Sequence, residues 1–267
     1  MKLTAHQLEQ FDRDGYVFLP ELFSPSEVAA LTEDLPRIFS LDRPEVLRAE
    51  SGEVRGALAM ERYSEPFARL LRHPRLVDPA HQVLGGRVYG HQYKVIAKEP
   101  FGELDFPWHQ DFASWRANDG MPEPLAMNYA VFLDEVSEFN GPITLIPGSH
   151  RDGCLPSEAR DLPGSTPLYS LDKETVRRLV SAGGMVAPKG PPGSGIFFHG
   201  CMAHASGPNL SPWPRHIVYL TCNRVDNYIR RPTRPDHFAN QDFTAIEPLA
   251  DDCLMDMTGN QAAEVSA

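Results

Sequence analysis

The second half of the chain consists of short strand-type segments separated by turns, and this pattern constrains the fold most. Turn-forming residues such as those of 138–142 lie between segments rich in β-branched and aromatic residues. Many short strands in series predict an antiparallel sandwich or barrel. We therefore expect a mainly β protein of jelly-roll type. The segments expected as strands are 88–96, 127–133, 143–146, 195–199 and 217–221.

The N-terminal third has mostly helical patterns. Thr4 with Gln7 forms a capping-box sequence, and Gly15 stands where that first helix should end. Such helices are expected to pack on the outer face of the β-sandwich. The expected helices are 4–14, 24–35, 64–84 with a break near Pro74, and 173–182; the expected loops are 40–56 and 151–170; a strand is expected over 16–19.

Length and charge limit the organisation and the class of partner. With 267 residues, 42% of them hydrophobic, the chain is expected to form a single domain around one large core. Its expected parts are a mostly helical support (1–86), the jelly-roll core (87–230) and a C-terminal extension (231–267), whose last dozen residues are expected to be poorly ordered. The net charge of −11 argues against nucleic acid and anionic membranes as partners.

The N-terminus and the hydropathy pattern bear on location. No apolar run approaches the length of a membrane span, and the first residues lack the apolar region of a signal peptide. The scattered cysteines read as free thiols. We expect a cytoplasmic protein, monomeric or homodimeric, that acts on a small molecule.

The sequence His109-Gln110-Asp111 is the first indication of chemistry. In extended backbone, residues i and i+2 point to the same side, so one imidazole and one carboxylate can reach one point. These are two of the three ligands of the facial triad in non-heme Fe(II) oxygenases. Taken alone, the motif is weak, because it is common by chance and more often represents a pair of side chains in a surface turn.

A later histidine, His204, is followed eleven positions on by Arg215. Iron held by two histidines and one carboxylate keeps positions open for a bidentate co-substrate and for O₂. A 2-oxo acid with a second carboxylate needs a cation at its far end, and the planar guanidinium suits this purpose. His199 is the main rival to His204, but no arginine follows it at that spacing. His91 and His150 are expected in the core or in turns.

With these residues identified, the sequence resembles the phytanoyl-CoA dioxygenase family of Fe(II)/2-oxoglutarate oxygenases. Within that family it is most similar to bacterial hydroxylases of free amino acids and related zwitterions, of the proline, leucine and ectoine types. The resemblance implies a double-stranded β-helix, which agrees with the jelly-roll prediction. The segments that carry it are 14–17, 108–112, 115 with 119–122, 140–142, 146–150, and 204–209 with 211–215.

The resemblance also implies roles for particular residues. The implied iron ligands are His109, Asp111 and His204. The implied 2-oxoglutarate residues are Arg215, which would pair with the far carboxylate, Ser206, and the pocket-bordering Gln92, Asn128 and Lys94. The implied substrate residues are Arg55, which would hold a carboxylate, and Trp115, which would form a pocket wall. Arg55 is equally readable as a solvated loop charge, Trp115 as a core aromatic and Lys94 as a charge at a strand edge.

The implied reaction is hydroxylation of an unactivated C–H bond in a small free amino acid or related zwitterion. Fe(II), 2-oxoglutarate and O₂ would be used, with succinate and CO₂ as co-products. Since Asp111 is present, hydroxylation is favoured over halogenation, which needs that position vacant. The alternatives are the same chemistry on a carrier-bound or other natural-product intermediate, a metal-dependent enzyme without redox chemistry, and a cupin-like binding protein. The last two have no need of Arg215.

Overall fold

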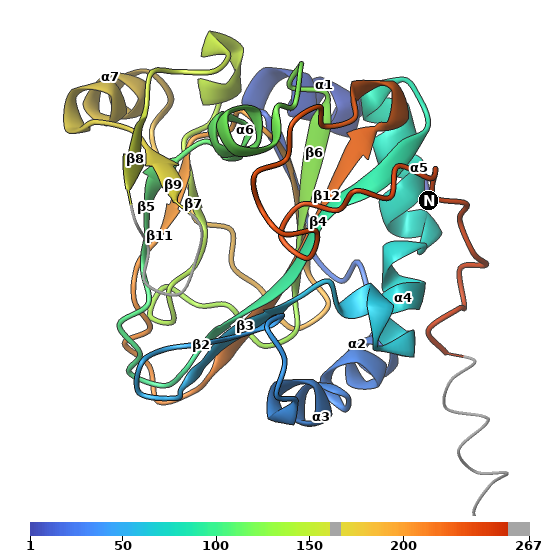
Figure 1. Ribbon diagram of the computed structural model, residues 1–267. Coiled ribbons are helices and arrows are strands. Elements are labelled where there is room, and N and C mark those ends of the chain that lie inside the picture. The colour runs from blue at the N-terminus through green and yellow to red at the C-terminus, as the bar shows by residue number, and fades with distance from the viewer. Residues whose placement is uncertain (161–166, 256–267) are drawn as a thin grey trace, which may run out of the picture.

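Two antiparallel sheets that face each other form the centre of the protein (Figure 1). The computed structural model describes residues 1–160 and 167–255. The larger sheet runs β1 (Tyr16–Leu19), β10 (Gly195–His199), β6 (Ala126–Phe132), β12 (Arg215–Arg224), β4 (Val88–Lys98), β3 (Val54–Leu58), β2 (Val46–Arg48). The smaller sheet runs β7 (Thr144–Leu145), β11 (His204–Ser206), β5 (Phe106–His109), β9 (Leu168–Ser170), β8 (Glu158–Arg160). The predicted jelly roll, or double-stranded β-helix, is confirmed.

Helices lie outside the larger sheet, as Figure 1 shows for α4 and α5. The first helix begins and ends where the sequence predicts, because Thr4 forms the capping box with Gln7 and Gly15 takes a left-handed φ of 79°. The helices are α1 (Ala5–Asp14), α2 (Pro25–Thr32), α3 (Leu35–Ser40), α4 (Glu65–Leu71), α5 (Pro74–Leu84), α6 (Asp111–Ser114) and α7 (Lys173–Gly183), and a π-helical turn (Trp115–Asp119) follows α6.

Strand β6 is buried on both faces. Its side chains point alternately to the two sides of the sheet and so belong to two different layers. Met127, Tyr129 and Val131 belong to the core between the larger sheet and the helices. Ala130 and Phe132 belong to the core between the two sheets. The same alternation in β4 and β12 turns their second set of side chains toward the inside of the jelly roll, where the candidate site lies.

Three predictions of local structure are wrong. The helix expected over 24–35 is two helices, since α2 ends at Thr32 and Leu35 begins α3. The expected loop 40–56 contains β2 and the start of β3, and the expected loop 151–170 contains β8 and β9. Of these short strands, β3 and β9 pair with strands distant in the chain, β4 and β5, and β2 and β8 pair with β3 and β9. Local propensity does not show the distant pairings. The region expected to be mostly helical therefore contains β2 and β3 in addition to the predicted strand β1.

The poorly ordered tail expected for the last dozen residues lies outside the described residues. Within 1–160 and 167–255, no helix has both the length and the apolar character needed to cross a membrane.

Candidate metal centre and adjoining cavity

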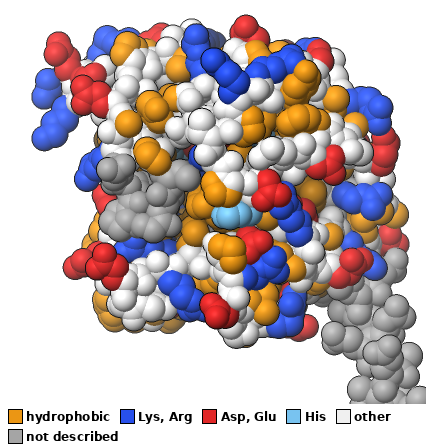
Figure 2. All heavy atoms as spheres, in the orientation of Figure 1, with side chains coloured by type: hydrophobic (Ala, Val, Ile, Leu, Met, Phe, Trp, Pro, Cys, Tyr) orange, Lys and Arg blue, Asp and Glu red, His pale blue; other side chains and the backbone are white. Residues whose placement is uncertain are grey.

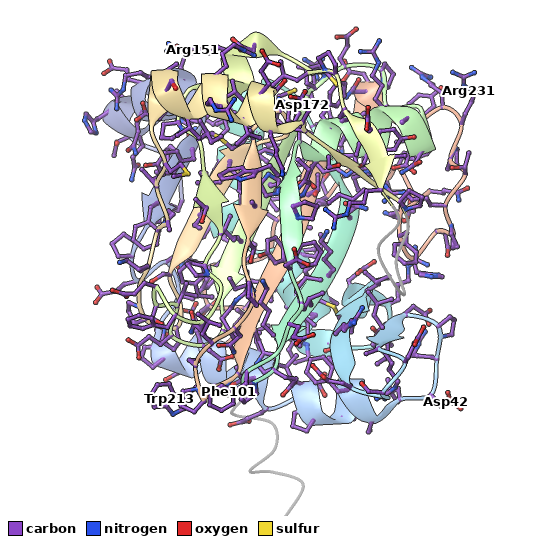
Figure 3. The ribbon with its side chains drawn as sticks, turned by 90° about the vertical axis from the view of Figure 1, so that its left-hand side faces the viewer. Asp42, Phe101, Arg151, Asp172, Trp213 and Arg231 are labelled. Carbon is purple, nitrogen blue, oxygen red and sulfur yellow. The ribbon has the colours of Figure 1, made fainter. Side chains whose placement is uncertain are left out.

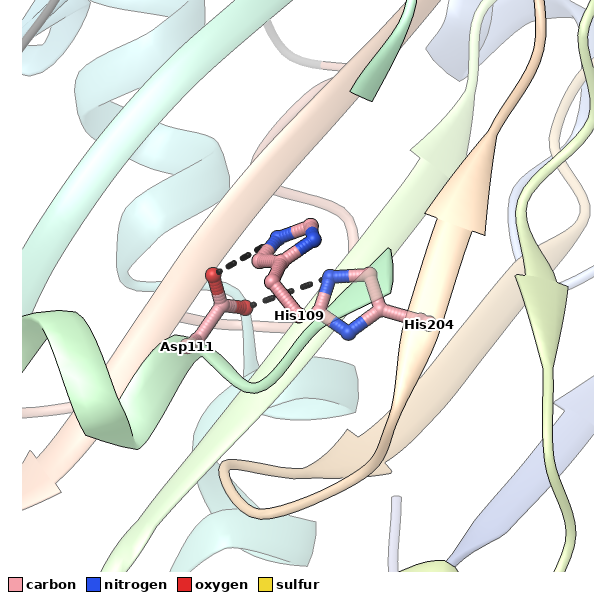
Figure 4. Close-up of side chains that lie close together, drawn as sticks. All are labelled: His109, Asp111 and His204. Atoms are coloured by element: carbon pink, nitrogen blue, oxygen red, sulfur yellow. Dashed lines mark ion pairs between the residues drawn. The ribbon is translucent and has the colours of Figure 1, made fainter. Parts of the chain in front are cut away.

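His109, Asp111 and His204 meet between the two sheets (Figure 4). His109 is the last residue of β5 and Asp111 is the first residue of α6. Gln110 between them is extended, with φ −117° and ψ 128°, so the flanking side chains point to the same side. His204 begins β11 and pairs directly opposite His109 across the antiparallel ladder. Strand pairing therefore supplies the third member of the cluster.

The three side chains are close enough to share one metal ion. Nε2 of His109 lies 3.5 Å from Oδ1 of Asp111, and Nε2 of His204 lies 3.6 Å from Oδ2. All three ligand atoms lie within 4.8 Å of one another. Two imidazoles and one carboxylate form the donor set that non-heme Fe(II) oxygenases use, so the residues present fit that metal.

Backbone carbonyls orient both histidine rings. Nδ1 of His109 lies 2.7 Å from the carbonyl oxygen of Pro107, and Nδ1 of His204 lies 2.9 Å from that of Met202. In this arrangement Nδ1 carries the proton and donates to the carbonyl. Each Nε2 therefore keeps its lone pair directed toward the centre of the cluster, as metal-ligating histidines do.

Asp111 is held as an anion. Burial alone would raise its pKa, but His204 and His109 outweigh burial and hold the pKa of Asp111 well below its usual range. Burial and the neighbouring His109 lower the pKa of His204 to about 4. An ionised carboxylate and neutral imidazole are the protonation states that bind a metal. Asn128 donates to Oδ2 of Asp111 at 2.8 Å and accepts from Oγ1 of Thr221 at 2.6 Å, which fixes the carboxylate.

A small inner compartment of about 40 Å³ adjoins the cluster. Beyond it lies Arg215, whose side chain is fully buried. Its Nη2 donates to the carbonyl oxygen of Gly141 at 2.6 Å and to Oγ of Ser206 at 3.2 Å. Its Nη1 is buried and has no hydrogen-bond partner among residues 1–160 and 167–255. The lining of the inner compartment includes the three cluster residues with Lys94, Asn128, Ser206, Tyr219 and Thr221.

A second buried basic side chain, Lys98, stands opposite Arg215 in the register of β4 and β12. Its Nζ contacts the carbonyl oxygens of Ser206 and Gly207. Burial and the charge of Arg215 lower the pKa of Lys98 to about 6. In the described part of the chain, neither basic side chain forms an ion pair with a carboxylate. Because an unpaired buried charge is costly, this end of the compartment favours an anionic ligand.

A larger outer cavity of about 280 Å³ also adjoins the cluster. It shares His109, Asp111 and Lys94 with the inner compartment. Its wall carries both signs of charge among apolar side chains; the charged members besides the shared ones are Arg55, Arg234, Glu103 and Asp105. Figure 2 shows the face of the molecule that is turned to the viewer in Figure 1. Near its centre lies a histidine, with basic, acidic and hydrophobic side chains around it.

The structure places the remaining predicted site residues at these two spaces. Gln92 lines both, and its amide accepts from Nε1 of Trp115 at 2.9 Å and donates to the carbonyl oxygen of Phe238 at 2.8 Å. Trp115 is buried in an apolar cluster and also lines the outer cavity. Arg55 lies half-buried on β3 in the wall of the outer cavity. Asn128 contacts Asp111 and lines the inner compartment. The roles of these residues stay predictions.

Sequence reasoning missed Lys98, Asp119 and Arg234. Lys98 is recognisable only from the register that places it opposite Arg215. Asp119 and Arg234 form a buried ion pair across 115 residues of sequence, and no local pattern indicates such a pair.

A jelly roll with an inward-facing His–Asp–His cluster defines the class of non-heme metal-dependent oxygenases. Residues 11–217 match the model of phytanoyl-CoA dioxygenase (PhyH), and the chain belongs to this family. The predicted resemblance and the predicted enzyme class, a dioxygenase, are confirmed.

Several characterised relatives are similar over most of their length. L-proline trans-4-hydroxylase from Streptomyces griseoviridis is 38% identical, over 95% of this chain and 100% of that protein. Ectoine dioxygenase from Bordetella parapertussis is 36% identical, over 92% of this chain and 86% of that protein. The crystal structure of EctD from S. alaskensis with 2-oxoglutarate and 5-hydroxyectoine has a TM-score of 0.81 at 33% identity, covering 92% of this chain and 87% of that one. EctD has also been crystallised with bound Fe.

Proposed function

We propose that this protein is an Fe(II)- and 2-oxoglutarate-dependent hydroxylase of a small free amino acid or related zwitterion. The observation that carries the proposal is the buried Arg215 near the His–Asp–His cluster, whose Nη1 forms no hydrogen bond within the described part of the chain. A 2-oxo acid that chelates the metal would present its far carboxylate to this guanidinium. The relative EctD supports the proposal, since its crystals hold 2-oxoglutarate and, separately, Fe.

His109, Asp111 and His204 would hold the iron, which supplies O₂ activation when bound. Arg215 and Ser206 would bind the far carboxylate of 2-oxoglutarate, and the charge of Lys98 would stabilise it further. Asn128 keeps Asp111 in place, while Gln92 orients Trp115. Co-products would be succinate and CO₂. The protein's own contribution is binding, orientation and the exclusion of water from a buried site.

The lining of the outer cavity suits a small substrate that carries one positive and one negative charge. Pockets for drug-sized ligands have volumes of roughly 300–1,000 Å³. The outer cavity, with about 280 Å³, lies just below this range and therefore suits a smaller molecule. Cations such as Arg55 and acids such as Glu103 line it together, which suits a zwitterion better than a neutral molecule. The proline hydroxylase and the ectoine dioxygenases are named for substrates of this kind. We further propose a cytoplasmic location and a monomeric or homodimeric state.

Succinate release across a panel of free amino acids and ectoine tests this function. We expect at least one zwitterion to stimulate release of succinate that requires both Fe(II) and O₂. Turnover that persists without O₂, or with Zn(II) in place of Fe(II), would show a metal-dependent enzyme without redox chemistry. Oxidation of carrier-bound substrates alone would leave the cofactors correct and the substrate class wrong.

Replacing Arg55 with alanine is expected to raise the KM for the substrate about tenfold or more, because an arginine–carboxylate contact in a closed pocket is costly to lose. The KM for 2-oxoglutarate and the rate of uncoupled succinate release should change little, since Arg55 does not line the inner compartment. Steady-state kinetics in both substrates measure the two effects. Unchanged substrate kinetics would exclude Arg55 as the carboxylate anchor.

Binding of 2-oxoglutarate at about pH 8 is expected to take up a proton, because Lys98 with its pKa of about 6 is mostly neutral there. An incoming carboxylate favours the ammonium form and raises that pKa. The uptake should diminish as the pH falls below 6, where Lys98 is already charged. Titration calorimetry in buffers of different ionisation enthalpy measures the uptake. It should disappear in Lys98→Met, and an equal uptake in that variant would assign the proton elsewhere.

A further inference from the structure

The chain after β12 crosses back over the mouth of the outer cavity. We call residues 230–240 the strap. The NH of Thr233 donates to the carbonyl oxygen of Asn118 at 2.8 Å, and the NH of Asn240 donates to that of His91 at 2.9 Å. The strap thus connects the π-helical turn after α6 with β4. Figure 1 shows this part of the chain, in red, passing in front of β4 and near α6.

Of the two spaces at the metal centre, the strap lines only the outer cavity. Arg234, His237 and Phe238 line that cavity, and none of them lines the inner compartment. The strap therefore faces the space assigned to the substrate, and its link to the inner compartment is the hydrogen bond that Gln92 donates to the carbonyl oxygen of Phe238. It also begins after residue 217, where the match to the family model ends.

A buried ion pair holds the strap in place. Nε of Arg234 donates to Oδ1 of Asp119 at 2.9 Å, and Nη2 donates to Oδ2, so the contact is bidentate. Asp119 is fully buried, and Arg234 is 9% exposed. The main-chain NH of Arg231 adds a bond to the carbonyl oxygen of Asp119 at 3.1 Å. Two fixed parallel hydrogen bonds remove the rotational freedom of the guanidinium, and they fix the backbone that carries it.

The remaining guanidinium nitrogen, Nη1 of Arg234, makes no hydrogen bond to any residue in 1–160 or 167–255. Because Asp119 neutralises its charge, Arg234 offers the cavity a directed donor rather than a net positive charge. A directed donor on the strap would let the cavity discriminate between substrates by the position of a polar group.

We propose that the strap is the specificity-determining wall of the substrate cavity, and that the Asp119–Arg234 pair is the positioning device that holds it. The inference rests on the proposed function, because it assigns the outer cavity to the substrate. A displaced wall misorients the substrate while the metal and 2-oxoglutarate stay bound. Even a small displacement lowers the efficiency of the reaction strongly.

The test uses Arg234→Gln, Asp119→Asn and the double variant in the full-length, iron-loaded enzyme, with a zwitterion that the wild type hydroxylates. We expect the substrate KM to rise by about tenfold to a hundredfold. The ratio of hydroxylated product to succinate should fall. The KM for 2-oxoglutarate should stay within about twofold, since no side chain of the strap lines the inner compartment. The double variant removes both charges, so it avoids leaving one buried charge unpaired.

Arg231→Gln is the matched control. Arg231 belongs to the same strap, but it is exposed and points away from the body of the protein in Figure 3. This variant should keep the wild-type substrate KM and product ratio. An unchanged substrate KM in the folded double variant, or an equal rise in Arg231→Gln, would overturn the role of the pair. A wild-type protein that releases no succinate with any zwitterion would instead overturn the proposed function, and the role of the strap with it.

Discussion

Replacing Asp111 with alanine is expected to abolish turnover and to weaken Fe(II) binding by at least about a hundredfold, because even residues that only support a metal ligand commonly cost 10–100-fold. Asp111 is the carboxylate that both histidines face, at 3.5 Å and 3.6 Å. Without it, two neutral imidazoles would have to bind a dication alone. Titration of the protein with Fe(II) under anaerobic conditions and succinate release in air measure the two losses.

His199→Gln is the control for this experiment, because His199 is the histidine that rivals His204 in the sequence. In the structure Nδ1 of His199 accepts from the main-chain NH of Cys201, and its ring lies near that of His150 with centroids 5.3 Å apart. It is not part of the clustered donor set. The variant should keep iron binding and turnover. Full activity in Asp111→Ala, or loss of iron in His199→Gln, would contradict the assigned metal centre.

Local sequence signals predicted the parts of the fold that short-range contacts determine. The capping box of Thr4 and the left-handed Gly15 involve residues a few positions apart, and both are where the sequence places them. The His-x-Asp motif was informative for the same reason. Extended backbone at Gln110 is enough to bring two side chains to one side.

Features set by strand pairing were not predictable in this way. The loop expected over 40–56 forms β2 and part of β3 because β4 offers a free edge, which the charged local sequence does not indicate. Lys98 meets Arg215 through the register of two strands more than a hundred residues apart in the sequence. The Asp119–Arg234 pair spans 115 residues. Such contacts follow from topology, and a single sequence carries no signal for them.

Replacing Arg215 with methionine is expected to raise the KM for 2-oxoglutarate about thirtyfold or more. Losing one partner of a buried, hydrogen-bonded charge pair costs about 2–5 kcal/mol, and each 1.4 kcal/mol corresponds to about tenfold in affinity. The stability of the ligand-free protein should stay level or rise. In the ligand-free protein Arg215 is buried, and no described residue forms an ion pair with it. Of the two carbonyl oxygens that it contacts, those of Asn140 and Gly141, the second also accepts from Oγ of Ser206 at 2.9 Å. Kinetics in 2-oxoglutarate and thermal unfolding without ligand measure the two effects.

The opposite directions of these effects separate a binding role from a structural one. If the arginine stabilised the fold, its replacement would lower both the stability of the protein and its affinity for 2-oxoglutarate. If it serves ligand binding, it destabilises the ligand-free protein, and its replacement lowers the affinity alone. Arg224→Met provides the control on the same strand, because Arg224 pairs with Asp226 at 2.8 Å near the protein surface. Its KM for 2-oxoglutarate should equal that of the wild type. An unchanged KM in Arg215→Met would show that the buried guanidinium does not bind the co-substrate.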